Sequence, residues 1–277
     1  MASNLRIIAD NWSDLATLSA SPALALPASN LQTQSRGEIM RTTGLATQQI
    51  LGDFDQARIC SACALVRHNL TSAATWRLEL FSGAGQSGTT VYDSGSVTAL
   101  PGYGWGEFRW GVDAWGGSIF LGWGQAFSNL WFASTPALSF RLTISDPGNP
   151  VGYLQASRLV IGAYFEPLRN MSSGVDVSWA ENSAQRRTDG GSLRTDGRVA
   201  YRRWQFSLDF LNAAERGVVL DVFRRAGLRG DLFISCYPEQ GGAQERDHAG
   251  LVKLVRMPGM RRNSLEMYAS GLMFEES

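Results

Sequence analysis

The sequence predicts a mostly β protein with two domains, the second of which has an α+β order. Apolar and polar residues alternate along several segments, one segment has helical spacing, and the pattern changes near residues 166–173. The chain has 277 residues, more than the usual ~100–150 of a single domain. Hydrophobic residues make up 44% of it and charged residues 18%, a composition that can build cores and argues against disorder.

Alternation of apolar and polar side chains predicts strands with one face on a core and the other toward water. In residues 76–80, 138–144 and 204–210, a large apolar side chain occupies every second position. Residues 59–66 are instead almost continuously small or apolar. Such a run is typical of a strand that is buried on both faces.

One amphipathic segment predicts a helix over about residues 213–226. Asn212 is placed to cap its start, and Glu215 follows three residues later, close to a capping box. An apolar stripe then recurs at helical spacing, formed by Val219, Val222, Phe223 and Ala226. Gly227 is placed to end the helix, and residues 231–237 predict the next strand.

We expect the domain boundary near residues 166–173. A strand over 158–165 ends there at Pro167, and a new β pattern begins at Val175. The second part then has strands, one helix and more strands, which is an α+β order. The two expected domains are residues 1–168 and 169–277.

Charge and composition narrow the function classes. The net charge is zero, so no excess of positive charge is present to neutralise nucleic-acid phosphates. Residues 1–10 lack the pattern of a secretory signal, and no stretch approaches the ~20 apolar residues that span a bilayer. We therefore expect synthesis in a cytoplasm, no membrane insertion, and free thiols at the three cysteines.

Two short motifs lie in the wrong context for the chemistry that they suggest. Cys60 and Cys63 form C-x-x-C, but zinc normally needs a second ligand pair, and redox chemistry needs the motif at a helix start. Inside a buried strand, core packing is favoured. Gly83, Gly85 and Gly88 form G-x-G-x-x-G, yet a strand follows instead of the helix that a dinucleotide site requires. We expect no metal and no cofactor.

No residue set indicates catalysis. His68 lies at a strand end and His248 in a polar loop, and no G-x-S-x-G or H-E-x-x-H motif is present. Paired carboxylates for glycoside hydrolysis meet only in the fold, and the sequence singles out no pair. We expect no catalytic residues and no enzyme, with a glycosidase as the third alternative.

Residues from about 103 to 132 are rich in tryptophan and glycine. Tryptophans here would suit a domain core, a subunit interface where they bury much area, or a platform for sugar rings. The sequence leaves these three interpretations open. Five of the nine tryptophans are in this segment: Trp105, Trp110, Trp115, Trp123 and Trp131.

Residues 186–203 are polar and rich in arginine. Asp-Gly pairs at 189–190 and 196–197 are strong signals for tight turns. The segment is either a solvated hairpin or an arm that reaches a neighbouring subunit through arginine–carboxylate pairs. We favour the arm, because so long a polar segment would otherwise have no role. Its candidate contacts are Arg186, Arg187, Arg202 and Arg203.

Several stretches of the first part of the chain have a sequence pattern that resembles a known type of domain: 26–31, 65–70, 76–80 with 91–95, 140–144, and 156–162. In these stretches residues 1–167 resemble the galactose-binding-like, discoidin-type domain. This resemblance implies an N-terminal β-sandwich of the jelly-roll type. Residues 103–132 depart from a minimal sandwich and look like an insertion.

Segments 201–210, 212–226 and 230–235 carry a second pattern. Through them, residues from about 171 to 277 resemble distal-tail or minor tail proteins of long-tailed bacteriophages. This resemblance implies a β-barrel or β-sandwich with one packed helix, closing with other copies into a ring around the tail channel.

Together the two resemblances imply a non-catalytic structural subunit of a phage tail tip or baseplate. Its partners would be copies of itself, as a hexamer or else a trimer, together with the tail tube, the hub, and fibres or receptor-binding proteins. It would be made in the bacterial host cytoplasm and located in the virion. The alternative is a lectin-like module that recognises host glycans, in which aromatic residues of 103–132 line an open groove.

Overall fold

The computed structural model describes residues 4–100, 106, 108–112, 118–120, 125–172, 174–264 and 266–277. Its contacts divide the chain into two compact units. Unit 1 is formed by Met1–Glu166 with Leu232–Gly250, and unit 2 by Pro167–Asp231 with Leu251–Ser277. The first division falls at the proline where we expected a boundary. Residues 232–250, however, belong to unit 1 and interrupt the expected second domain.

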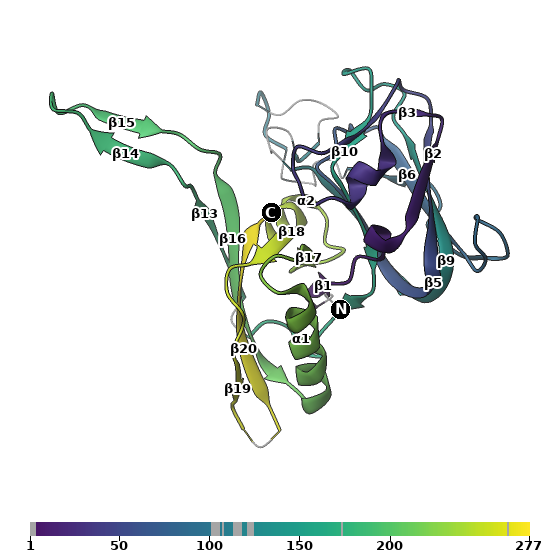
Figure 1. Cartoon of the computed structure of the whole chain (residues 1–277). Helices are drawn as coiled ribbons and strands as arrows, with labels where there is room; N and C mark the ends of the chain where they lie inside the picture. The colour runs from purple at the N-terminus through teal and green to yellow at the C-terminus, as the bar shows by residue number, and fades with distance from the viewer. Residues whose placement is uncertain are drawn as a thin grey trace. The chain divides into compact units, whose positions relative to one another are not determined.

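Unit 1 contains a β-sandwich, as predicted (Figure 1). The larger sheet has the order β11-β5-β9-β6-β7, with β2 beside β5 and β8 beside β6, and the smaller sheet has the order β10-β4-β3. One continuous cluster of buried side chains, including Trp76, Phe140 and Met40, fills the space between them. The strands are β2 (Thr17–Ser21), β3 (Leu24–Leu26), β4 (Met40–Thr42), β5 (Gln48–Val66), β6 (Thr75–Phe81), β7 (Thr90–Asp93), β8 (Val97–Thr98), β9 (Phe127–Ser145), β10 (Gln155–Ala156) and β11 (Arg158–Gly162).

A third layer of unit 1 covers the outer face of the larger sheet. It contains three neighbouring strands, β12 (Tyr164–Phe165), β1 (Arg6–Ile8) and β17 (Leu232–Ser235), and the short helix α2 (Gly242–His248). Phe233 of β17 packs on Phe127 and Trp131 of β9, with ring centroids 5.6 and 6.2 Å apart.

This layer explains why β5 is buried on both faces, as the run over 59–66 predicted. Residues 60–66 are all buried, and Ile59 alone is half exposed. Helix α2 was not predicted, because seven residues are too few for a helical stripe to show. His248, expected in a loop, is the last residue of this helix.

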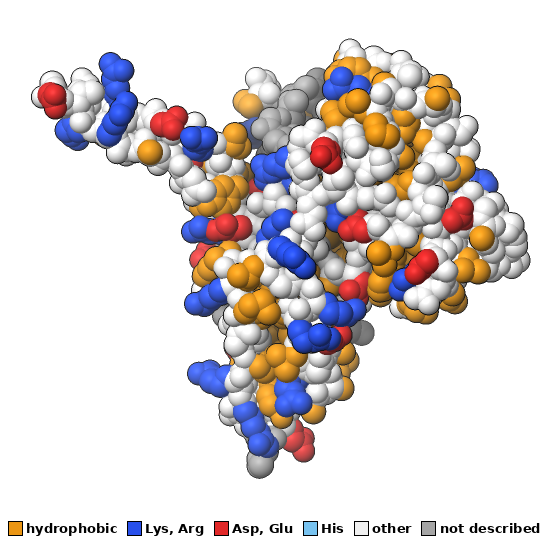
Figure 2. Space-filling model, viewed as in Figure 1, with side chains coloured by type: hydrophobic (Ala, Val, Ile, Leu, Met, Phe, Trp, Pro, Cys, Tyr) orange, Lys and Arg blue, Asp and Glu red, His pale blue; other side chains and the backbone are white. Residues whose placement is uncertain are grey.

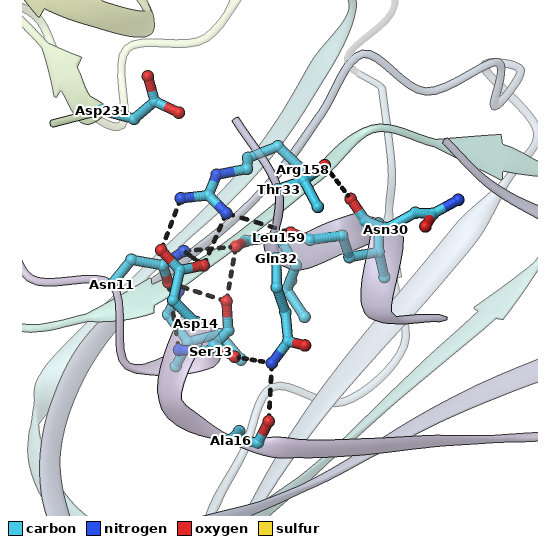
Figure 3. A network of polar contacts seen from close by, with 12 residues as sticks. Asn11, Ser13, Asp14, Ala16, Asn30, Gln32, Thr33, Arg158, Leu159 and Asp231 are labelled. Carbon is cyan, nitrogen blue, oxygen red and sulfur yellow. Dashed lines mark hydrogen bonds and ion pairs between the residues drawn. The ribbon is translucent and has the colours of Figure 1, made fainter. Parts of the chain in front are cut away.

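A polar network joins the start of unit 1 to β11 (Figure 3). Arg158 donates two hydrogen bonds, of 2.6 and 2.7 Å, to the carboxylate of Asp14, and its side chain is 2% exposed. Ser13 donates to the carbonyl of Leu159, and Gln32 donates to the carbonyls of Ser13 and Ala16. These bonds fix the 3-10 helices η1 (Trp12–Leu15) and η2 (Ala28–Gln32) on β11, since a buried guanidinium or amide is stable only when it is paired.

Unit 2 has the predicted α+β order. Its sheet runs β18-β20-β16-β13, with β19 also beside β20, and helix α1 (Ala213–Ala226) follows β16. Phe223 of α1 lies against Phe274 of β20, with ring centroids 6.4 Å apart. The strands are β13 (Val175–Ala180), β14 (Ala184–Arg187), β15 (Leu193–Asp196), β16 (Tyr201–Leu211), β18 (Ala249–Leu254), β19 (Met260–Arg262) and β20 (Tyr268–Glu276).

The start of α1 confirms the predicted capping box. The side chain of Asn212 accepts a hydrogen bond from the backbone N–H of Glu215, and the Glu215 carboxylate accepts one from the backbone N–H of Asn212, both at 2.9 Å. These bonds satisfy two N–H groups that a helix start otherwise leaves unpaired. Of the predicted stripe, Val219, Val222 and Phe223 are buried. In the part of the chain that the structure describes, no helix is long and apolar enough to cross a membrane.

Candidate functional site

The most distinctive feature of unit 2 is a two-stranded hairpin, β14 and β15, that projects beyond the ends of β13 and β16 (Figure 1). Every residue of both strands is exposed. Within the described residues, the two strands pair with each other and with no further strand. An isolated two-stranded hairpin is marginally stable in water, so this hairpin gains most from a partner. We call residues 184–196 the arm.

The arm carries arginines that its own carboxylates do not neutralise. Arg186 and Arg194 are directly opposite each other in the register, so their side chains leave from the same face. Like charges in such a pair are destabilising. Neither guanidinium forms an ion pair among the described residues, whereas Asp196 pairs with Arg198 at 3.3 Å. Arg187 donates to the carbonyl of Gly191 across the turn.

Arg202 and Arg203, expected to belong to the arm, lie in β16 instead. The Arg202 side chain is 2% exposed, and its Nε donates to Glu276 at 3.1 Å. Arg203 donates to Glu275 at 2.6 Å. Both partners lie on the neighbouring strand β20 of the same sheet, so both arginines are paired within unit 2. This corrects the expected extent of the arm to the residues before β16.

Unit 2 also exposes many large apolar side chains. It is the smaller unit, yet it contains ten of the seventeen large hydrophobic residues that the described part of the chain exposes. Figure 2 shows apolar side chains on this unit with arginines between them. For its size, unit 2 therefore leaves more large apolar side chains in water than unit 1 does. The ten are Leu168, Trp179, Leu193, Val199, Phe210, Val218, Leu220, Leu228, Val255 and Met257.

Two of the five candidate tryptophans can be placed, and they differ. Trp110 is 75% exposed and meets the ring of Phe108 edge to face, with centroids 5.3 Å apart. Trp131 is half-buried beneath the third layer of unit 1 and packs edge to face on Tyr164 at 5.5 Å. Trp131 is therefore a packing residue. Trp105, Trp115 and Trp123 lie outside the described residues.

A cavity of about 420 Å³ lies in unit 1. One wall is formed by Phe127, Asn129 and Trp131, which alternate along β9 and so share its outer face. The opposite wall comes from the segment that contains Glu239 and Glu245. The remaining lining residues are Thr98, Ala99, Ile119, Phe120, Ser128, Leu130, Gly241, Gly242 and Arg246.

Asn129 and Glu245 were not singled out from the sequence. No local pattern in the sequence relates Glu245 to Asn129, more than a hundred residues earlier. In the structure the Asn129 amide donates to the Glu245 carboxylate at 2.7 Å. Alternation with Trp131 does place Asn129 on the outer face of β9, so a partial signal existed.

The C-x-x-C cysteines are core residues, as predicted. Cys60 and Cys63 are free and belong to the buried cluster of unit 1. Burial raises the pKa of the Cys60 thiol to about 12 and also raises the pKa of Cys63. The glycine triplet lies between β6 and β7 and connects two strands, as its context indicated.

His68 is buried in unit 1 as a neutral side chain. Its Nδ1 accepts a hydrogen bond from the backbone N–H of Leu70 at 3.3 Å, so its Nε2 carries the proton and donates to the Ser128 hydroxyl at 2.9 Å. Ser128 in turn donates to the carbonyl of Ala99. Burial lowers the pKa of His68 to about 3. These contacts assign His68 to structure.

Comparison with known proteins finds likeness only among solved structures. No protein-family model and no curated protein matches the chain. A chitosan-binding module from a chitosanase/glucanase of Paenibacillus sp. IK-5 is similar over 56% of this chain and 99% of its own, with 15% identity and a TM-score of 0.39. CpGH89CBM32-5 of Clostridium perfringens, in complex with GalNAc-β-1,3-galactose, covers 56% of this chain and 100% of its own, with 14% identity and a TM-score of 0.37. A fucose binding module of Streptococcus pneumoniae covers 55% and 94%, with 10% identity and a TM-score of 0.37.

Proposed function

We propose that this protein is a non-catalytic structural subunit that assembles through unit 2, as a subunit of a phage tail tip or baseplate would. The observation that carries the proposal is the arm, a fully exposed hairpin with two opposed arginines. Its partners would be copies of itself, the tail tube, the hub, and fibres or receptor-binding proteins. Its location would be the virion.

The mechanism is burial of complementary surfaces, repeated by symmetry. A closed ring requires each subunit to present two different surfaces that fit each other. The arm offers one surface, with Arg186 and Arg194 as donors for carboxylates. The exposed apolar side chains of unit 2 would form part of the second surface. A specific interface of this kind buries more than ~1,000 Å² in total. A hexamer is the preferred ring, with a trimer as the fallback.

Removal of the arm tests this proposal. We would replace residues 184–196 by a short Gly-Ser linker and measure the mass of the full chain in solution by sedimentation. We expect the unaltered chain to form one ring of uniform mass, and the armless variant to be a folded monomer. Trp110→Ala is the control and should leave the ring intact. A ring that forms without the arm, or an unaltered chain that stays monomeric at every concentration, would contradict the proposal.

Glycan binding is the second candidate, and the cavity of unit 1 favours it. A volume of about 420 Å³ is in the range of small-ligand sites, and aromatic and polar groups line it together. The two candidates differ in which unit interacts with a partner, so variants in one unit separate them.

A further inference from the structure

The cavity of unit 1 has one wall from the sandwich and one from outside it. Phe127, Asn129 and Trp131 belong to β9, whereas Glu239 and Glu245 belong to residues 232–250, which follow the whole of β16 and α1 in the chain. A sandwich alone would therefore lack five of the fourteen lining residues. The site depends on the pairing of β17 with β1, which brings residues 232–250 into unit 1.

Glu245 presents a buried carboxylate to the cavity. The residue is 9% exposed, its Oε1 accepts from the amide of Asn129 at 2.7 Å, and its Oε2 accepts from the backbone N–H of Gly241 at 3.0 Å. Within the described residues it forms no ion pair. A carboxylate has about four lone-pair sites, so two remain after these bonds. A ligand that donates hydrogen bonds would occupy them.

Asn129 complements this carboxylate. Its amide has two N–H hydrogens and one carbonyl oxygen, and the bond to Glu245 uses one hydrogen. One donor and one acceptor thus remain beside the acceptor sites of Glu245. Vicinal hydroxyl groups, each both a donor and an acceptor, match this alternation.

Besides the polar side chains of Thr98, Ser128, Glu239 and Arg246, the cavity has an apolar part. Phe120 and Phe127 lie edge to face with centroids 5.0 Å apart, and Ile119 is beside them. They suit the C–H face of a ring. A wholly apolar ligand would remove water from Glu245 without replacing its hydrogen bonds, which is costly. An acidic ligand would meet the carboxylates of Glu239 and Glu245, and Arg246, which also lines the cavity, is already paired with Asp247 at 2.7 Å.

We infer that this cavity binds one pyranose ring of a neutral or amino sugar, with Asn129 and Glu245 holding adjacent hydroxyls and Phe120 and Phe127 packing on the ring. The inference rests on the glycan-binding candidate and gives it a site.

Titration with single sugars tests the site on the full chain. The probes are glucose, galactose, glucosamine and glucuronic acid. Saturation-transfer NMR measures the binding of each. We expect a dissociation constant in the millimolar range for at least one of the first three, and weaker binding of glucuronic acid. Thr98→Phe places a ring at the exposed rim of the cavity and should weaken binding at least tenfold.

Thr90→Phe is the matched control, because Thr90 is equally an exposed strand threonine but does not line the cavity. Asn129→Leu keeps the side-chain volume and should also weaken binding at least tenfold. Melting curves establish that each variant is folded. Sugar binding that survives Thr98→Phe and Asn129→Leu would overturn the site while keeping glycan binding. Absence of binding to every probe would overturn both, and would leave assembly through the arm untouched.

Discussion

The two units differ in how much of their apolar surface they bury. Unit 1 packs two sheets around one continuous core, in which most large side chains are less than 5% exposed, and covers the outer face of the larger sheet with a third layer. Unit 2 has one sheet and one main helix, leaves ten large apolar residues exposed, and extends a hairpin into solvent. A chain segment that is costly to leave in water is usually retained for a partner. Unit 1 thus buries most of its large apolar side chains, whereas unit 2 leaves many of its own in water, as the proposed assembly through unit 2 requires.

The largest expected effect concerns the internal ion pair of unit 2. Arg202→Ala leaves the Glu276 carboxylate, which is 6% exposed, without its cation. Breaking a buried pair in this way typically costs about 3–5 kcal/mol of unfolding free energy. Arg203→Ala, one residue away on the solvent side, should change stability little. Chemical denaturation of both variants measures the difference, and equal losses would show that Arg202 is not buried as described.

Acidification should lower the stability of the protein through His68 in unit 1. The unfolded imidazole takes up a proton below about pH 6.5, whereas the folded one does so only near pH 3. Between these values the unfolded state binds more protons, so stability falls as pH falls, by at most about 1.4 kcal/mol per pH unit from this group. Denaturation at several pH values should give a smaller slope for His68→Gln than for the unaltered chain. Identical slopes would mean that the folded imidazole titrates normally.

Replacement of a sheet glycine by alanine should have different effects on stability in the two units. In unit 1, a Cβ on Gly52 would lie 2.2 Å from the ring of the fully buried Phe140, directly opposite on β9. In unit 2, a Cβ on Gly271 would meet only the Ser207 hydroxyl, at 3.8 Å. Gly52→Ala should cost about 1–3 kcal/mol through overpacking, and Gly271→Ala clearly less. Melting temperatures of the two variants give the test, and Phe140→Leu should relieve the first.

The smallest expected effect on stability belongs to the arm. Leu193 is 54% exposed, so Leu193→Ser should change the unfolding free energy by less than about 0.5 kcal/mol. It should nevertheless weaken assembly measured by sedimentation. Val91→Ser, on an exposed strand of unit 1, should affect neither property. If Val91→Ser weakens assembly and Leu193→Ser does not, the roles assigned to the two units are reversed.

Local patterns in the sequence were sufficient to predict the main helix and the main strands. The spacing of Val219, Val222 and Phe223 and the cap at Asn212 predicted α1 correctly, because a helix is stabilised by residues three or four positions apart. Alternation predicted the main strands, because side chains two positions apart lie on the same face of a strand. Period two also places Arg202 on the face of Trp204 in β16, so its burial could have been inferred.

Only the tertiary structure decided which distant segments meet. The partner of Arg202 is Glu276 on β20, and no spacing along the chain encodes that pairing. The pairing of β17 with β1 moved residues 232–250 into unit 1, covered β5 and completed the cavity. Strand pairing joins backbone groups that any residue carries, so the sequence determined the strands and their faces, while packing of the whole chain chose their neighbours.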